Sequence, residues 1–182
     1  MAYAGQTIHN PQTGETITFL QTVAETNGKL LQLECRVAPG RGLKIPAHMH
    51  PIQEQRFLVK TGKMKFELDR AERMLGPGDR MTVPARVFYN WRAEGPEELR
   101  FEAEYEPAGH WEDIFESTFE LARRAAGKPY NQLLAVAVMM DHFKDHLVIA
   151  GPPPFVQRAM FSILGAVGRA VGYQAIYRYM EV

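Results

Sequence analysis

The sequence predicts a mainly β protein, an antiparallel barrel or sandwich, that ends in an extension of about three helices. Two observations lead to this prediction. Up to residue 107, short segments rich in β-branched and aromatic residues alternate with turns of Gly, Pro and Asn. Beyond Pro107, apolar residues recur near the helical spacing. We therefore expect a β-barrel over residues 1–107 and a helical extension, packed on the barrel or on a partner subunit, over residues 108–182.

The expected strands follow from alternation and from turn chemistry. Residues 15–23 are rich in Thr, Ile, Phe and Val, and Asn27-Gly28 is a strong hairpin dipeptide. Residues 31–37 alternate apolar and polar side chains, which is the pattern of a half-buried strand. Further short strands recur between residues 54 and 105, among them 63–69, 81–84, 87–91 and 99–105.

Three helices are expected in the C-terminal extension. The first covers residues 111–126 and ends at Gly127. The second begins with Asn131 as its N-cap and runs to about residue 150, where three prolines stop it. The third covers residues 155–172.

Composition narrows the range of functions. Lys plus Arg and Asp plus Glu both number 21, so the net charge is zero and favours neither nucleic acid nor an anionic membrane. The single cysteine, Cys35, excludes an internal disulfide framework and suits a reducing compartment. Residues 1–10 lack the pattern of a secretory signal, and Arg158 and Arg169 interrupt the most apolar C-terminal run. We expect a cytoplasmic protein that binds neither nucleic acid nor membrane.

Two histidines mark the candidate site. His48 and His50 stand two residues apart, just before a predicted strand. Side chains at i and i+2 of an extended strand point to the same face, so both imidazoles can converge on a metal ion or a polar pocket.

The surrounding run resembles the first signature of the cupin family, which is Gly, five residues, His-x-His, three or four residues, Glu, six residues, Gly. Gly42, His48, His50 and Gly62 occupy the corresponding positions. Two alignments compete for the glutamate. Glu54 follows three residues after His50, whereas Gln55 follows four and leaves the six residues that the family has before Gly62. Alternation along the strand favours Gln55 as the inward residue and Glu54 as the outward one.

A second stretch, residues 76–91, resembles the second cupin signature. Gly78 and Pro84 keep its spacing, and Trp91 matches a common aromatic position. Arg86 stands at the later glycine, and Tyr89 stands where the family has a histidine. The resemblance covers roughly residues 28–107 and implies a cupin, or jelly-roll, β-barrel. The tail looks like an extension seen on some bacterial single-domain cupins.

The resemblance also implies a metal site with an altered set of ligands. Cupin ligands come from the two histidines, the glutamate and the second-signature histidine, which correspond here to His48, His50, Gln55 and Tyr89. Losing a carboxylate and a third imidazole removes negative charge and reduces the ligand count. We expect any divalent metal at His48, His50 and Gln55, with Zn, Fe, Ni or Mn as candidates, to be bound weakly or not at all.

Two main functions are compatible with these residues, and the sequence does not decide between them. The first is binding of a small molecule in the barrel. The second is a metal-dependent cupin enzyme of the isomerase, cyclase or dioxygenase type, with no catalytic residue assigned. We also expect a homodimer, and a pure assembly module is a third reading. The expected pocket residues are His48, His50, Gln55, Phe57, Tyr89 and Trp91.

Other reactive side chains are expected to be structural. His142 and His146 stand four residues apart in the second predicted helix, but no third zinc ligand follows. Together with Asp141 and Asp145 they are expected to form a solvated helix face. Cys35 alternates with apolar residues and is expected to be a small buried side chain.

Overall fold

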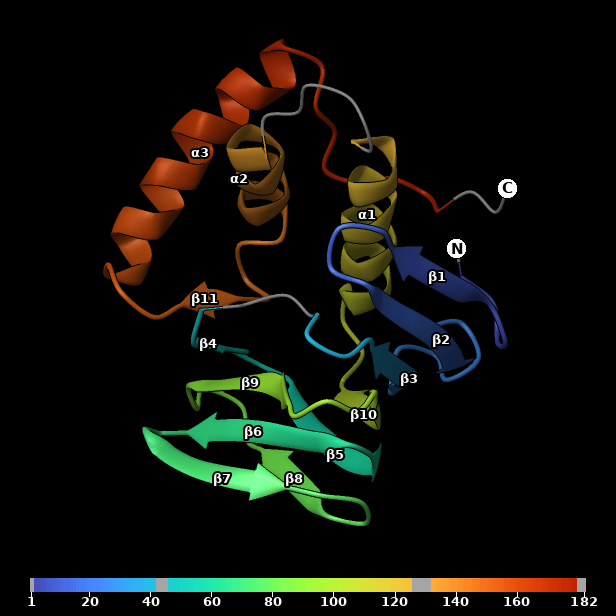
Figure 1. The fold of residues 1–182 in the computed structure, drawn as a ribbon. Helices are drawn as coiled ribbons and strands as arrows, with labels where there is room; N and C mark the ends of the chain where they lie inside the picture. The colour runs from blue at the N-terminus through green and yellow to red at the C-terminus, as the bar shows by residue number, and fades with distance from the viewer. Residues whose placement is uncertain (1, 42–45, 126–131, 180–182) are drawn as a thin grey trace.

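The computed structural model describes residues 2–41, 46–125 and 132–179, which form two antiparallel sheets and three helices (Figure 1). The sheets have six and five strands, in the orders β1-β2-β3-β10-β5-β8 and β11-β4-β9-β6-β7. The strands are β1 (Thr7–Asn10), β2 (Glu15–Gln21), β3 (Leu31–Val37), β4 (His48–Met49), β5 (Glu54–Thr61), β6 (Lys63–Leu68), β7 (Ala71–Leu75), β8 (Arg80–Val83), β9 (Tyr89–Glu94), β10 (Leu99–Glu106) and β11 (Val148–Ile149).

The two sheets pack face to face through their apolar sides. Phe57 of β5 meets Phe66 of β6 with ring centroids 5.3 Å apart, and Trp91 of β9 meets Phe101 of β10 at 4.9 Å. Strand alternation explains this core, because inward residues of β3 and β10 are buried while their neighbours are partly exposed. The predicted fold class, antiparallel jelly-roll strands followed by helices, is confirmed, although the described strands form two separate sheets and do not close into the expected barrel.

A glycine fixes the turn between β5 and β6. Gly62 has a φ of +74°, and a Cβ placed on it would lie 2.5 Å from the carbonyl oxygen of Glu98. Only glycine combines this left-handed conformation with so close an approach of two backbones. The Gly62 position of the signature is therefore explained by sterics, whereas Gly42 lies outside the described residues.

The helices are α1 (Trp111–Arg124), α2 (Gln132–His142) and α3 (Pro154–Ala170). Figure 1 shows α1 beside the edge of the six-stranded sheet, and α2 and α3 paired above the other sheet. None of these three helices, within the described part of the chain, has the length and apolarity that crossing a membrane requires. The predicted first and third helices are present with ends shifted by one or two residues.

The prediction for the second helix is wrong at its C-terminal end. The helix stops at His142, and Val148–Ile149 forms β11, which pairs with His48 and Met49. This short strand satisfies backbone groups at the outer edge of β4 that a longer helix would leave unpaired. The three prolines begin α3 rather than end α2, since Pro154 occupies its first turn. The predicted N-cap, Asn131, lies outside the described residues.

Buried acidic residues hold α1 in place. Glu112 accepts hydrogen bonds from the backbone N–H groups of Ala2 and Val23, at 3.1 and 3.0 Å. On the next turn, Glu116 pairs with Arg178 of the C-terminal segment at 2.7 Å. The helix is thus tied to both ends of the described chain, which matters because its inner face lines the cavity described next.

Candidate functional site

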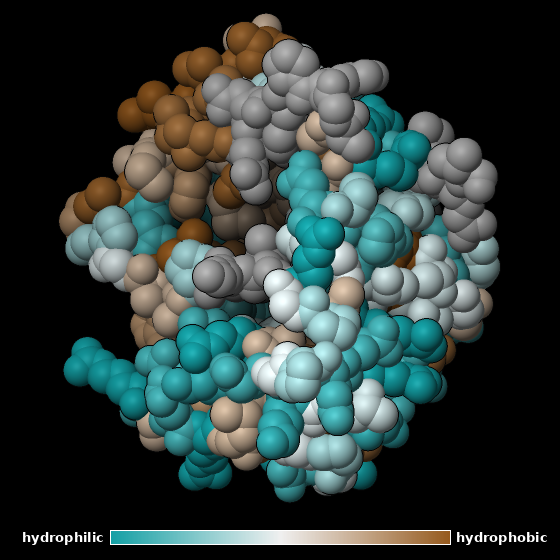
Figure 2. Space-filling view, in the orientation of Figure 1, coloured by the Kyte–Doolittle hydropathy of each residue, from teal (hydrophilic) through white to brown (hydrophobic). Residues whose placement is uncertain are grey.

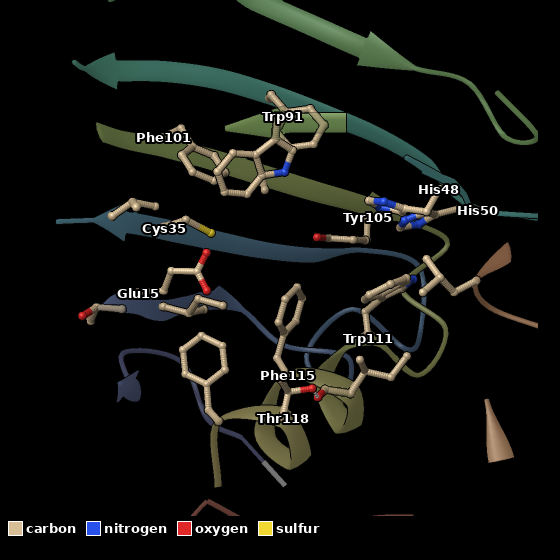
Figure 3. Close-up of a pocket in the computed structure, with 18 of the residues that line it drawn as sticks. Glu15, Cys35, His48, His50, Trp91, Phe101, Tyr105, Trp111, Phe115 and Thr118 are labelled. Atoms are coloured by element: carbon tan, nitrogen blue, oxygen red, sulfur yellow. Dashed lines mark hydrogen bonds between the residues drawn. The ribbon is translucent and has the colours of Figure 1, made fainter. Parts of the chain in front are cut away.

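A cavity of about 220 Å³ lies between the mouth of the two sheets and α1. Figure 3 shows His48, His50 and Trp111 at one end of it, Glu15 and Cys35 at the other, and Phe115 and Thr118 reaching up from α1. The larger lining side chains are Ile17, Val37, His48, His50, Phe57, Tyr89, Trp91, Phe101, Tyr105, Trp111, Ile114, Phe115, Phe119, Met140 and Leu147.

The histidine end is built by β4, the residue after it, and β9. His48 pairs with Tyr89 across the two strands, and their ring centroids lie 4.5 Å apart. The His48 and His50 rings lie 5.3 Å apart and on the same side, as the i, i+2 spacing predicts. All three side chains line the cavity.

A hydrogen-bonded network defines the protonation of this group. The Tyr89 hydroxyl donates to Gln55 Oε1, so its oxygen accepts from His50 Nε2–H at 3.1 Å. His48 Nδ1–H donates to the Pro46 carbonyl at 3.0 Å, which leaves a lone pair on His48 Nε2. No described residue is hydrogen-bonded to His48 Nε2, so it is the ring nitrogen open to a ligand.

Burial keeps every member of the network uncharged. Desolvation lowers the pKa of His48 despite the opposing hydrogen bond to Pro46. Desolvation, with smaller contributions from His48 and His146, lowers the pKa of His50 to about 2. Burial also raises the pKa of Tyr89. At neutral pH the site therefore presents two neutral imidazoles and a phenol.

Stacked aromatic rings form the wall beside the histidines. Trp111 of α1 stacks on His50 with centroids 4.4 Å apart and planes 10° apart, and it stacks on Tyr105 at 5.1 Å. Trp91 and Phe101 form an edge-to-face pair further along the cavity. These contacts make the wall beside the histidines largely aromatic and apolar.

The far end of the cavity contains its charged and sulfur groups. Cys35 is buried, as predicted, and its side chain lines the cavity near Glu15 (Figure 3). Burial raises the pKa of its thiol, so the group stays protonated at neutral pH and is a poor nucleophile. Arg36 also borders the cavity, but Glu34 binds its guanidinium through hydrogen bonds of 3.0 and 2.8 Å.

Five of the six expected pocket residues line the cavity, and Gln55 does not. It lies behind Tyr89, fully buried, and holds the tyrosine hydroxyl. The expected orientation of the competing glutamate is confirmed, because Glu54 faces outward and pairs with Arg56 at 2.9 Å. His142 and His146 do not share a helix face, since α2 ends between them.

The sequence reasoning missed the contribution of the C-terminal extension. Trp111, Phe115 and Thr118 face the cavity from α1, and Met140 and Leu147 close it from the end of α2 and the turn beyond. The spacing of three and four residues along α1 could have indicated a common face. It did not indicate which surface that face would cover.

The donor groups do not fit a three-ligand metal centre. His50 Nε2 and Gln55 Oε1 are both engaged by the Tyr89 hydroxyl, and His50 Nδ1 is buried without a partner, so among the described side chains of this network His48 Nε2 is the nitrogen left to face the cavity. Among the described residues, no three His, Cys, Asp or Glu side chains lie close enough together to hold a metal ion. Protein metal sites of the catalytic type use three ligands, so we derive no chemical step through a metal here.

Comparison with known proteins identifies the central part of the chain. Residues 33–103 match the family described as the cupin domain. No match was found among the curated proteins. Identities to the solved structures described next are too low to carry an activity to this chain.

Solved structures with a similar fold include three bacterial proteins. KdgF from Halomonas sp. is 20% identical, with a TM-score of 0.46 over 55% of this chain and 86% of that one. An RmlC-like cupin from Shewanella frigidimarina is 21% identical, with a TM-score of 0.49 over 60% and 91%. A predicted oxalate decarboxylase from Thermotoga maritima is 16% identical, with a TM-score of 0.49 over 57% and 92%.

Proposed function

Because residues 33–103 of this chain are a cupin domain, we propose that the protein binds a small molecule in the cavity between the sheets and α1, without a tightly held metal. The ligand is uncharged, apolar or aromatic in its body, and carries one hydroxyl group. The observation that supports this most is the lining itself, in which stacked aromatic rings surround a neutral polar corner.

The charge of the cavity argues against anionic ligands. Among the described lining residues, Arg36 is the one permanently cationic side chain, and its guanidinium is bound by Glu34, which also pairs with Arg100. Both lining histidines are neutral at pH 7, because burial lowers the pKa of each. The carboxyl group of Glu15 also lines the cavity, so a ligand carboxylate would lie near another acidic group.

The size and walls of the cavity favour a compact ring. Its volume of about 220 Å³ suits a molecule of roughly one or two rings rather than a drug-sized ligand. Trp111 and Tyr105 offer ring faces, and the methyl-bearing side chains of Ile114 and Leu147 complete the apolar surface. Stacking on such faces stabilises aromatic ligands by about 0.5–1.5 kcal/mol per ring pair beyond burial.

The hydroxyl requirement follows from His48. Its Nε2 carries a lone pair in a largely apolar cavity, and a ligand O–H is the donor that would pair with it. A carboxylate has no proton to donate and would place its charge against this lone pair. Among ligands of equal shape, the protein should therefore bind an uncharged one that carries a hydrogen-bond donor more tightly than an anionic one.

Tryptophan fluorescence tests this proposal directly, because Trp91 and Trp111 are the two tryptophans of the chain and both line the cavity. Titration with benzyl alcohol is expected to change the emission saturably. Benzoate, which has the same ring, is expected to bind at least ~10-fold more weakly because its charge loses hydration without gaining a partner.

Two matched histidine variants serve as controls. His48→Ala removes the proposed acceptor and should weaken benzyl alcohol binding about fivefold, the value of one hydrogen bond. His9→Ala changes an exposed histidine on β1 and should leave binding unaltered. Equal or tighter binding of benzoate, or no saturable response to either compound, would contradict the proposal.

A further inference from the structure

The outward face of α3 is almost entirely apolar. Figure 2 shows brown side chains along this helix, at the upper left of the molecule. We call the following residues, which are between 40% and 68% exposed, the α3 stripe: Val156, Met160, Ile163, Val167 and Val171. Phe155, at 73% exposed, extends the stripe at its N-terminal end. Monomeric proteins rarely leave so continuous an apolar surface in water.

The opposite face of α3 is already used. Gly165 and Gly168 lie against α2, and a Cβ on Gly168 would approach Val138 Cγ2 to 2.5 Å. These glycines allow the two helix backbones to pack closely, with the side chains of the α3 stripe on the side away from α2. Within the described residues, the α3 stripe is left exposed to solvent.

We propose that the α3 stripe pairs with the same stripe of a second copy of this chain, in an antiparallel arrangement centred on Ile163. The stripe residues follow each other at intervals of 4, 3, 4 and 4 positions, so they lie along one side of the helix. A two-fold axis beside Ile163, between it and Leu164, would set Met160 opposite Val167, and Val156 opposite Val171. The stripe is thus complementary to itself, as a symmetric dimer requires.

The charges of α3 favour a protein partner over a lipid surface. Its two charged residues are Arg158 and Arg169, and each is paired within the chain, with Asp145 and Asp141 respectively, at 2.9 Å. Helices that lie on membranes carry an excess of Lys and Arg on their polar face. Here each arginine beside the stripe is paired with an aspartate, so no excess positive charge remains to attract anionic lipid. A surface of this kind suits contact with a second copy of the same chain.

The exposed area is sufficient for a weak to moderate dimer. The exposed fractions of the stripe and Phe155 correspond to on the order of 600 Å² per copy, near the ~800 Å² per partner of a standard interface. Small residues between the large ones, Ala159 and Ala166, allow two helices to approach.

Light scattering coupled to size exclusion tests the proposal on the full chain. The protein is expected at twice its mass of 20.7 kDa, and Ile163→Glu combined with Val167→Glu is expected to return it to 20.7 kDa. The control is Met74→Glu, which places a glutamate on an exposed apolar residue of β7 and should leave the dimer intact. Circular dichroism shows whether each variant keeps its fold.

Cysteine cross-linking tests the antiparallel register independently. Ile163→Cys should form a disulfide-linked dimer on mild oxidation, whereas the natural Cys35 is buried and should not. A mixture of Val156→Cys and Val171→Cys should cross-link, and each alone should not. Monomeric mass at 100 μM, cross-linking of Val156→Cys with itself, or flotation of the monomer with phosphatidylcholine/phosphatidylglycerol vesicles would overturn the proposal.

Discussion

Replacing Gln55 by Glu together with Tyr89 by His is expected to raise the affinity of the site for Zn²⁺ by at least ~100-fold. In the natural chain the Tyr89 hydroxyl occupies both Gln55 Oε1 and His50 Nε2. The double replacement removes that hydroxyl, frees His50 Nε2, adds a third imidazole and supplies a carboxylate. Outer-shell changes alone alter metal affinity by ~10–100-fold, and completing the inner ligand set should exceed that range.

Isothermal titration calorimetry with Zn²⁺ measures this gain in affinity. A third substitution in the double variant serves as the control. Adding His48→Ala to the double variant removes one of the four proposed ligands and should abolish most of the gain. An unchanged zinc affinity in the double variant would mean that Gln55 and Tyr89 do not stand at the two positions where the cupin pattern places ligands.

Glu112→Ala is expected to lower the free energy of unfolding by about 3–5 kcal/mol. Glu112 is buried, and its two carboxylate oxygens accept from the backbone N–H groups of Ala2 and Val23. Hydrogen bonds to a charged group contribute about 1.5–3 kcal/mol each, and the alanine leaves the buried N–H of Ala2 and the partly buried N–H of Val23 without an acceptor. Because α1 forms one wall of the cavity, ligand binding should weaken in the same variant.

Urea unfolding checks this value against two further variants. Glu112→Gln keeps one acceptor oxygen and should lose about half as much stability. Glu94→Ala removes an exposed carboxylate that pairs with Arg92 on the surface, and should change stability by less than ~0.5 kcal/mol. Similar losses for Glu112→Ala and Glu94→Ala would show that the buried contacts do not anchor α1.

The strands were predictable because each carries its own signal. Alternation over residues 31–37 and 99–105 reproduces the burial of β3 and β10 residue by residue. The end of α2 was not predictable in this way. Apolar residues continue past His142 as Phe143, Leu147 and Val148, and the sequence does not show that the last of these pairs with β4. Tertiary pairing, rather than local propensity, ends the helix.

The candidate site likewise has residues that could be predicted from the sequence and residues that could not. His48, His50 and Tyr89 were found because strand periodicity and the cupin spacing place them on one face. Trp111 and Phe115 were missed because neither the sequence of α1 nor that of the strands indicates that this helix packs against the sheets. Gln55 was assigned to the correct face of β5, but the bulk of Tyr89 separates it from the cavity.

The affinity of chelator-treated protein for benzyl alcohol, followed by tryptophan fluorescence, tests the central claim most directly. We predict the same dissociation constant before and after removal of metals, and again after Zn²⁺, Fe²⁺, Ni²⁺ or Mn²⁺ is added back, because His48 Nε2 and the aromatic wall form the site without an ion. Loss of binding on chelation, with recovery on return of one of these metals, would contradict the account.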